Sequence, residues 1–169
     1  MLERRKSEAS VLRDFEATGD LRIVTNLGDD IAEIAALAER IDESGKLGSV
    51  GLDPFGVGAI VDALAEVGIA GNDRVVGITQ GWKLTGAIKT AERKLADGTL
   101  IHGGTGLMAW AVGNAKVEPK GNAIVITKQA SGTAKIDPLM AAFNAVALMA
   151  TNPQAAGQSY LRSRELLVL

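Results

Sequence analysis

Hydrophobic residues follow two different spacings along the chain, and the spacing changes several times. Short apolar runs bounded by glycine or polar residues predict strands. They occupy residues 20–26, 47–52 and 73–79, and two further runs lie within 115–128, with Lys120-Gly121-Asn122 in the turn between them.

Between these runs, apolar residues recur every three or four positions, which predicts helices. The segment DDIAEIAALAERIDES, residues 29–44, places two aspartates ahead of an apolar stripe and stops before Gly45. Similar patterns predict helices over 54–68, 83–98, 106–114 and 137–150. Alternating strands and helices indicate an α/β protein whose sheet is mostly parallel in its middle, and ligands of such sheets gather at the carboxyl ends of the strands.

Two of the predicted helices begin with Asp-Pro, at Asp53 and at Asp137. An aspartate followed by proline is favoured as a helix cap, where it contributes about 1 kcal/mol. The functional alternative is that the two carboxylates converge on hard cations such as Mg²⁺ or Mn²⁺, which take oxygen ligands. Two carboxylates alone would bind such ions weakly. Spacing does not decide between these interpretations.

Composition narrows the possible chemistry. The 169 residues allow one domain with a real core, which must be aliphatic because only 4% of the residues are aromatic. The absence of cysteine excludes disulfides and thiolate sites, and the one histidine, His102, excludes a His-rich metal site. The net charge of −2 gives no global attraction to nucleic acid. Without a signal-peptide pattern or an apolar run of ~18 residues, we expect a cytoplasmic protein that does not enter a membrane.

Several segments, taken in order, resemble the C-terminal nuclease domain of phage terminase large subunits, the motor-nucleases that package viral DNA. They are GDLRIVTNLGDDIAEIAALAERI, VGLDPFGVGAIVDALAEVGI, VVGITQGWKLTGAIKTAERKLADGTLIHGG, LMAWAVGNAKV and ITKQASGTAKIDPLMAAFNAVALM. No single segment is very specific, but their order and spacing over residues 19–149 are. The resemblance implies an RNase H-like mixed sheet flanked by helices. It also implies metal-dependent endonuclease chemistry on double-stranded DNA, with small terminase and portal proteins as partners in the host cytoplasm.

By matching position, the resemblance makes Asp53 and Asp137 catalytic ligands of Mg²⁺ or Mn²⁺. It places Lys128, Lys135 and Gln80 at recurrent positions where they would contact DNA. Asn114 also falls on a recurrent position. The structural alternatives are that the two lysines are solvated surface cations and that Gln80 and Asn114 hold loops or cap helices. His102 is expected in a loop or at an edge rather than as a catalytic base.

The sequence departs from the family pattern in one respect. The family's first acidic ligand stands on an opening strand, and LERRKSEASVLRDFEATGD supplies no such strand; Asp14 and Asp20 are poor substitutes. No G-x-x-x-x-G-K-[ST] occurs, so the chain is not expected to be the ATPase motor. We therefore expect a charged segment (1–18), a partial nuclease domain lacking its first strand (19–150) and a tail (151–169), with weak or no activity. The alternatives are a non-catalytic RNase H-like assembly module and an unrelated small α/β ligand-binding domain.

Overall fold

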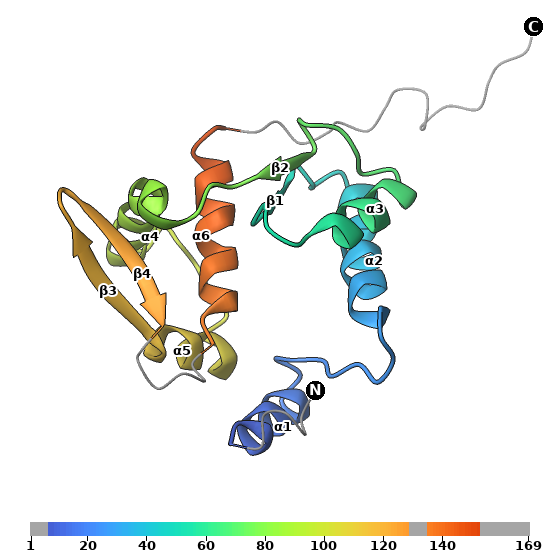
Figure 1. Cartoon of the computed structure of the whole chain (residues 1–169), viewed down its shortest axis with the longest axis horizontal. Coiled ribbons are helices and arrows are strands. Elements are labelled where there is room, and N and C mark those ends of the chain that lie inside the picture. The colour runs from blue at the N-terminus through green and yellow to red at the C-terminus, as the bar shows by residue number, and fades with distance from the viewer. Residues whose placement is uncertain (1–6, 129–134, 153–169) are drawn as a thin grey trace, which may run out of the picture. The chain divides into compact units, whose positions relative to one another are not determined.

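The computed structural model describes residues 7–128 and 135–152. The described residues form a mixed α/β protein (Figure 1). Its helices are α1 (Ala9–Ala17), α2 (Asp29–Glu43), α3 (Gly58–Glu66), the 3₁₀ helix η2 (Gly81–Leu84), α4 (Thr85–Ala96), α5 (Gly106–Gly113) and α6 (Asp137–Met149). Its strands are β1 (Val50–Leu52), β2 (Val75–Gly77), β3 (Ala115–Lys120) and β4 (Ala123–Lys128). The predicted tail lies outside the described residues from 153 onward, as do residues 1–6 of the predicted charged segment.

The strands pair in two separate sheets of two strands each. β1 and β2 are parallel, with Val50 opposite Val75, and β3 and β4 form an antiparallel hairpin, with Ala115 opposite Lys128. The expected α/β character is therefore present. The single mixed sheet of the sequence prediction does not occur among residues 7–128 and 135–152.

The chain divides into two compact units. The hairpin unit comprises Met1–Thr25 and Thr79–Ala147, and the β1–β2 unit comprises Asn26–Ile78 and Leu148–Leu169. The predicted site residues fall into both units. Asp53 belongs to the β1–β2 unit, whereas Gln80, Lys128, Lys135 and Asp137 belong to the hairpin unit.

The β1–β2 unit is built on an aliphatic core, as the low aromatic content predicts. Leu64 of α3 and Ile69 are fully buried and pack with Ala38 of α2. Arg74 and Asp42 add an ion pair at 2.6 Å, with about a fifth of each side chain exposed. This pair joins the end of α2 to the residue before β2, so that β2 can lie beside β1.

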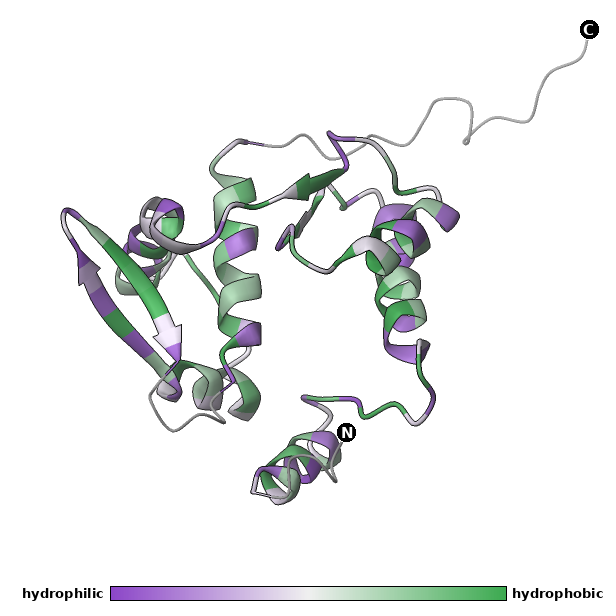
Figure 2. Cartoon of the chain, in the orientation of Figure 1, coloured by the Kyte–Doolittle hydropathy of each residue, from purple (hydrophilic) through white to green (hydrophobic). Residues whose placement is uncertain are grey.

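The hairpin unit also buries mainly aliphatic side chains, among them Leu84, Ile88 and Ala111, and it adds an aromatic contact. Phe15 of α1 packs against Trp110 of α5, with ring centroids 5.8 Å apart. The Asp20 carboxylate accepts a hydrogen bond from the Leu107 amide at 3.2 Å, which satisfies a free donor in the first turn of α5. β4 is hydrophobic along most of its length, whereas β3 alternates between polar and apolar residues (Figure 2). β3 nevertheless contributes little to packing, because most of its residues are exposed, Val117 among them at 59%.

The predicted strand over residues 20–26 is wrong. The amides of Asp20 and Leu21 both donate to the carbonyl of Phe15, at 2.9 and 3.1 Å, and Gly19 between helix and turn has a φ of 79°. These bonds terminate α1 in a tight turn. The apolar residues that follow have no strand partner among the described residues.

The predicted helix over 54–68 is correct in kind but starts too early. Gly56 has a φ of 73°, which is incompatible with an α-helix, and α3 begins at Gly58. The structure confirms, within a few residues, the hairpin with its turn at Gly121 and the predicted helices over 29–44, 83–98, 106–114 and 137–150. In the predicted helix over 83–98, the first residues belong to η2 and the rest form α4. Within the described part of the chain, no helix is long and apolar enough to cross a membrane.

Candidate functional site at the base of the hairpin

Three of the predicted site residues come together where the hairpin, α5 and α6 meet. Lys128, the last residue of β4, lies opposite Ala115 in the hairpin register. The preceding residue, Asn114, donates from Nδ2 to the carbonyl of Lys135 at 3.1 Å. Lys128 at the end of β4 and Lys135 just before α6 therefore both lie beside residues 114–115.

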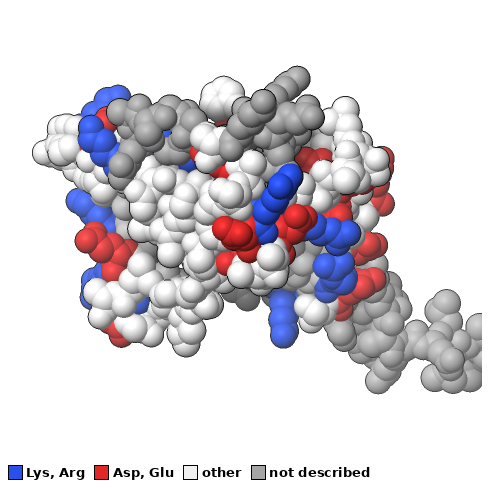
Figure 3. All heavy atoms as spheres, turned by 90° about the horizontal axis from the view of Figure 1, so that it is seen from below, with Lys and Arg blue, Asp and Glu red and all other residues white. Residues whose placement is uncertain are grey.

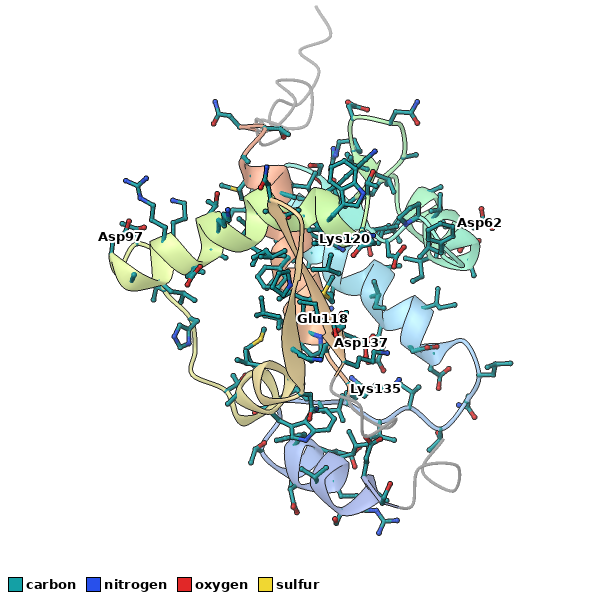
Figure 4. All side chains as sticks on the ribbon, turned by 60° about the vertical axis from the view of Figure 1, so that its left-hand side comes forward. Asp62, Asp97, Glu118, Lys120, Lys135 and Asp137 are labelled. Carbon is teal, nitrogen blue, oxygen red and sulfur yellow. The ribbon has the colours of Figure 1, made fainter. Side chains whose placement is uncertain are left out.

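Asp137 completes this group from the first turn of α6. The carbonyl of Ile136 accepts the amide of Met140 at 3.0 Å, so Ile136 is the capping residue and Asp137 is the first helical residue. The sequence prediction that Asp137 is itself the cap is off by one position. Its side chain is exposed and lies near Lys135, at the start of α6 (Figure 4). We call Lys128, Lys135 and Asp137 the hairpin-base cluster.

The electrostatics of the hairpin-base cluster suit a phosphate group or a phosphate with its counter-ion. Lys135 precedes the first residue of α6 by two positions, and the N-terminal end of a helix stabilises anions. Lys128 is exposed and Lys135 is half-buried, so at least one cation is free to reach a ligand in solvent. Glu118 of β3 is paired with Lys116 of the same strand at 3.2 Å.

Gln80 has a structural contact in this unit. Its Nε2 donates to Oδ1 of Asn144 at 3.0 Å, and Asn144 is buried within α6. This bond links the residue before η2 to the middle of α6. This hydrogen bond is consistent with the structural interpretation of Gln80, in which its side chain holds a loop. Asn114 holds a loop in the same way.

Asp53 lies at the end of β1, as the sequence predicts for a ligand-binding position in an α/β sheet. It does not cap α3, which begins at Gly58. Instead its Oδ1 accepts a hydrogen bond from the amide of Phe55 at 3.1 Å. This bond stabilises the turn in which Gly56 adopts a positive φ. The carboxylate remains exposed, so its second oxygen is accessible to a ligand.

The described side chains do not form a complete metal site. Across residues 7–128 and 135–152, no three His, Asp or Glu side chains gather closely enough to hold a metal ion. A two-ion site needs more oxygen ligands than Asp53 and Asp137 provide. The described residues thus supply only part of the divalent-ion site that the family implies, and no reaction step through an ion follows from them.

Other charged groups have local roles. His102 lies in an exposed loop and its Nδ1 accepts the amide of Gly104 at 3.1 Å. On the face displayed in Figure 3, Lys and Arg side chains are interspersed with Asp and Glu side chains. This face therefore carries no broad basic surface.

Sequence reasoning missed two residues that organise the site. Asn144 lies in an otherwise apolar helix pattern, and a lone polar residue on the buried face of α6 was an available signal. Thr85 begins α4, and its Oγ1 accepts the amide of Ile124 in β4 at 3.1 Å. No local pattern predicts this second contact, because its partners are 39 residues apart.

The chain was compared with protein families, with curated proteins and with solved structures. The family model of the terminase large subunit endonuclease domain matches residues 18–152. No curated protein and no solved structure matches. The matched span includes the hairpin-base cluster and Asp53, and it covers most of the 169 residues. The chain therefore belongs to the terminase large subunit endonuclease domain family.

Proposed function

We propose that this chain acts as a terminase nuclease-type domain that hydrolyses phosphodiester bonds of concatemeric viral double-stranded DNA during packaging. The observation that carries the proposal is the family match over residues 18–152. An RNase H-like fold, small terminase and portal partners and a phage-infected or prophage-bearing host cytoplasm belong to the same proposal. The match argues against the unrelated ligand-binding domain.

The proposed roles of the site residues follow from their positions. Lys128 and Lys135 contact DNA phosphates without reading bases, since an ammonium group is a point charge that suits phosphate. Asp137 and Asp53 bind Mg²⁺ or Mn²⁺ through their exposed carboxylates. Gln80 acts indirectly, by holding α6 through Asn144 at 3.0 Å, and reaches DNA only if that bond opens.

We further propose that the chain by itself cleaves DNA weakly or not at all. Two carboxylates bind a divalent ion weakly, and the described residues contain no group of three potential ligands. An additional carboxylate, from a partner or from another part of a longer protein, would complete the set.

The test is incubation of supercoiled plasmid with the purified chain and Mn²⁺. The account predicts slow nicking that is lost in both Asp53→Ala and Asp137→Ala, with Asp62→Ala as the matched control, because Asp62 is an exposed aspartate of α3. Robust cleavage that is lost in both variants would show that the site is complete. Cleavage that persists in both variants would show that these aspartates are not the ligands.

A second candidate is a non-catalytic module that retains the fold and serves in assembly. The absence of a three-ligand group among residues 7–128 and 135–152 favours it. Its signature is the absence of nicking together with no stabilisation by divalent ions. Heat stabilisation by Mn²⁺ that disappears in Asp137→Ala would instead favour a surviving ion site.

A further inference from the structure

The surface around Trp82 has no role in the function proposed above. Trp82 of η2 is 54% exposed, although tryptophan is usually well covered. Together with side chains from η2, the start of α4 and the hairpin turn, it lines a broad surface hollow of about 840 Å³. We call this hollow the Trp82 shelf; its lining residues are Trp82, Lys83, Thr85, Lys120, Asn122 and Ala123.

The Trp82 shelf is held in place by one threonine. Thr85 Oγ1 accepts the amide of Ile124 at 3.1 Å and lies within donating distance of two carbonyls, that of Trp82 at 2.7 Å and that of Ile124 at 3.0 Å. Because Ile124 belongs to β4, this contact fixes η2 against the hairpin. The shelf is thus formed before any ligand arrives.

The charged side chains described on the Trp82 shelf are two lysines. Lys83 Nζ lies over the Trp82 ring, 5.8 Å from its centroid, and Lys120 stands at the hairpin end of the hollow. Both lysines are exposed, and no carboxylate lines the hollow among the residues that the structure describes. Asn122 adds an amide that can both donate and accept hydrogen bonds. Figure 4 shows Lys120 at the end of the hairpin.

We propose that the Trp82 shelf binds an unpaired nucleotide of a DNA strand. The indole provides a surface on which a base can stack, the two ammonium groups attract the flanking phosphates, and the amide of Asn122 can meet a base edge. A base inside an intact duplex has both faces covered by its neighbours and cannot stack on the ring. An acidic peptide would satisfy the lysines but would leave the aromatic face without a matching group.

This site is independent of the carboxylates, and it is tested without metal ion. The probe is a fluorescein-labelled oligothymidine of roughly eight nucleotides, compared with a blunt duplex of the same length, in EDTA. The background variant Trp110→Phe leaves Trp82 as the single tryptophan, so that quenching of its fluorescence reports stacking at this residue. Anisotropy gives the affinity.

The proposal predicts that the single strand binds more tightly than the duplex and quenches Trp82. Trp82→Leu weakens binding roughly 5- to 100-fold, and Trp82→Tyr, which retains a stacking ring, restores most of it. Lys83→Gln and Lys120→Gln each lower the salt dependence of single-strand binding by roughly 0.7 in log–log slope. Lys46→Gln, an exposed lysine of the other unit, changes nothing.

Three results would overturn the proposal. They are equal binding of duplex and single strand, an unchanged affinity in Trp82→Leu, and the absence of oligonucleotide binding. Failure of the nuclease proposal is recognised separately, because plasmid cleavage depends on Mn²⁺ and Asp137, whereas this binding persists in EDTA and in Asp137→Asn.

Discussion

Asn114 donates from its side-chain amide to the backbone carbonyl of Lys135, 21 residues away, at 3.1 Å. Asn114 is the C-terminal cap of α5 and is followed directly by β3. The bond therefore joins the base of the hairpin to the start of α6. It therefore holds the backbone of Lys135, and with it the start of α6 at Asp137, beside the end of the hairpin that carries Lys128.

Asn114→Leu is expected to destabilise the chain and to weaken duplex DNA binding. The substitution leaves the Lys135 carbonyl without its partner, which costs about 1–3 kcal/mol. Urea unfolding measures the stability, and anisotropy of a labelled duplex measures the affinity. Asn72→Leu, an exposed asparagine of the other unit, should change neither. If the Asn114 variant keeps full DNA affinity, the bond does not organise a DNA site.

Helices and the hairpin were predictable from sequence because their signals are local. The stripe of α2 and the Gly121 turn need only neighbouring residues, and both occur where predicted. The predicted strand over 20–26 is absent because the amides of Asp20 and Leu21 donate to a carbonyl at the end of α1. Residue spacing does not reveal these hydrogen bonds. The predicted start of α3 is too early because Gly56 adopts a positive φ.

The candidate site was less predictable than the fold. Spacing placed Asp137 within one residue of the cap of α6, but it also placed Asp53 at the start of α3, where Asp53 instead accepts the amide of Phe55. The contacts of Gln80 with Asn144 and of Thr85 with Ile124 span 64 and 39 residues. Such bonds are set by the packing of elements, which no local pattern contains.

The hydrogen bond between the side-chain amides of Gln80 and Asn144 can be tested with a double-mutant cycle. Asn144→Leu should cost about 1–3 kcal/mol in the free energy of unfolding, because it leaves the Gln80 amide without this acceptor. Gln80→Leu should cost a similar amount. If the two side chains act as a pair, the double variant loses less than the sum of the single losses. Additive losses in urea unfolding would show that the bond contributes nothing of its own.

Thr85→Val should loosen the contact between η2 and the hairpin. Valine has nearly the same shape but no hydroxyl, so the Ile124 amide loses its acceptor at a cost of about 1–3 kcal/mol. Thr85→Ser retains the hydroxyl and is the matched control. Amide hydrogen exchange of Ile124 is the measurement, and it should accelerate in the valine variant alone. Equal exchange in the valine and serine variants would exclude this role for Thr85.

Asp97 offers a pH test at the end of α4. The Thr99 hydroxyl and amide both donate to its carboxylate, which holds the pKa of Asp97 below its ordinary value. Because the folded pKa is lowered, the stabilising contribution is present above the unfolded pKa and is lost as pH falls through the folded pKa. Thr99→Val should raise the pKa of Asp97 partway to its ordinary value, as followed by NMR titration of its carboxyl carbon. Thr99→Ser should leave it low, and an equal rise in both variants would contradict the assignment to the hydroxyl.

We propose that Asp137 and Asp53 each bind a divalent ion, and paramagnetic Mn²⁺ tests this central claim most directly. In NMR spectra of the full chain, sub-stoichiometric Mn²⁺ should broaden the amide signals that flank Asp137 and those that flank Asp53. Asp137→Asn should remove the broadening around α6, whereas Asp62→Asn should leave it unchanged. Broadening that is centred elsewhere, or that persists in full around α6 in Asp137→Asn, would contradict the account.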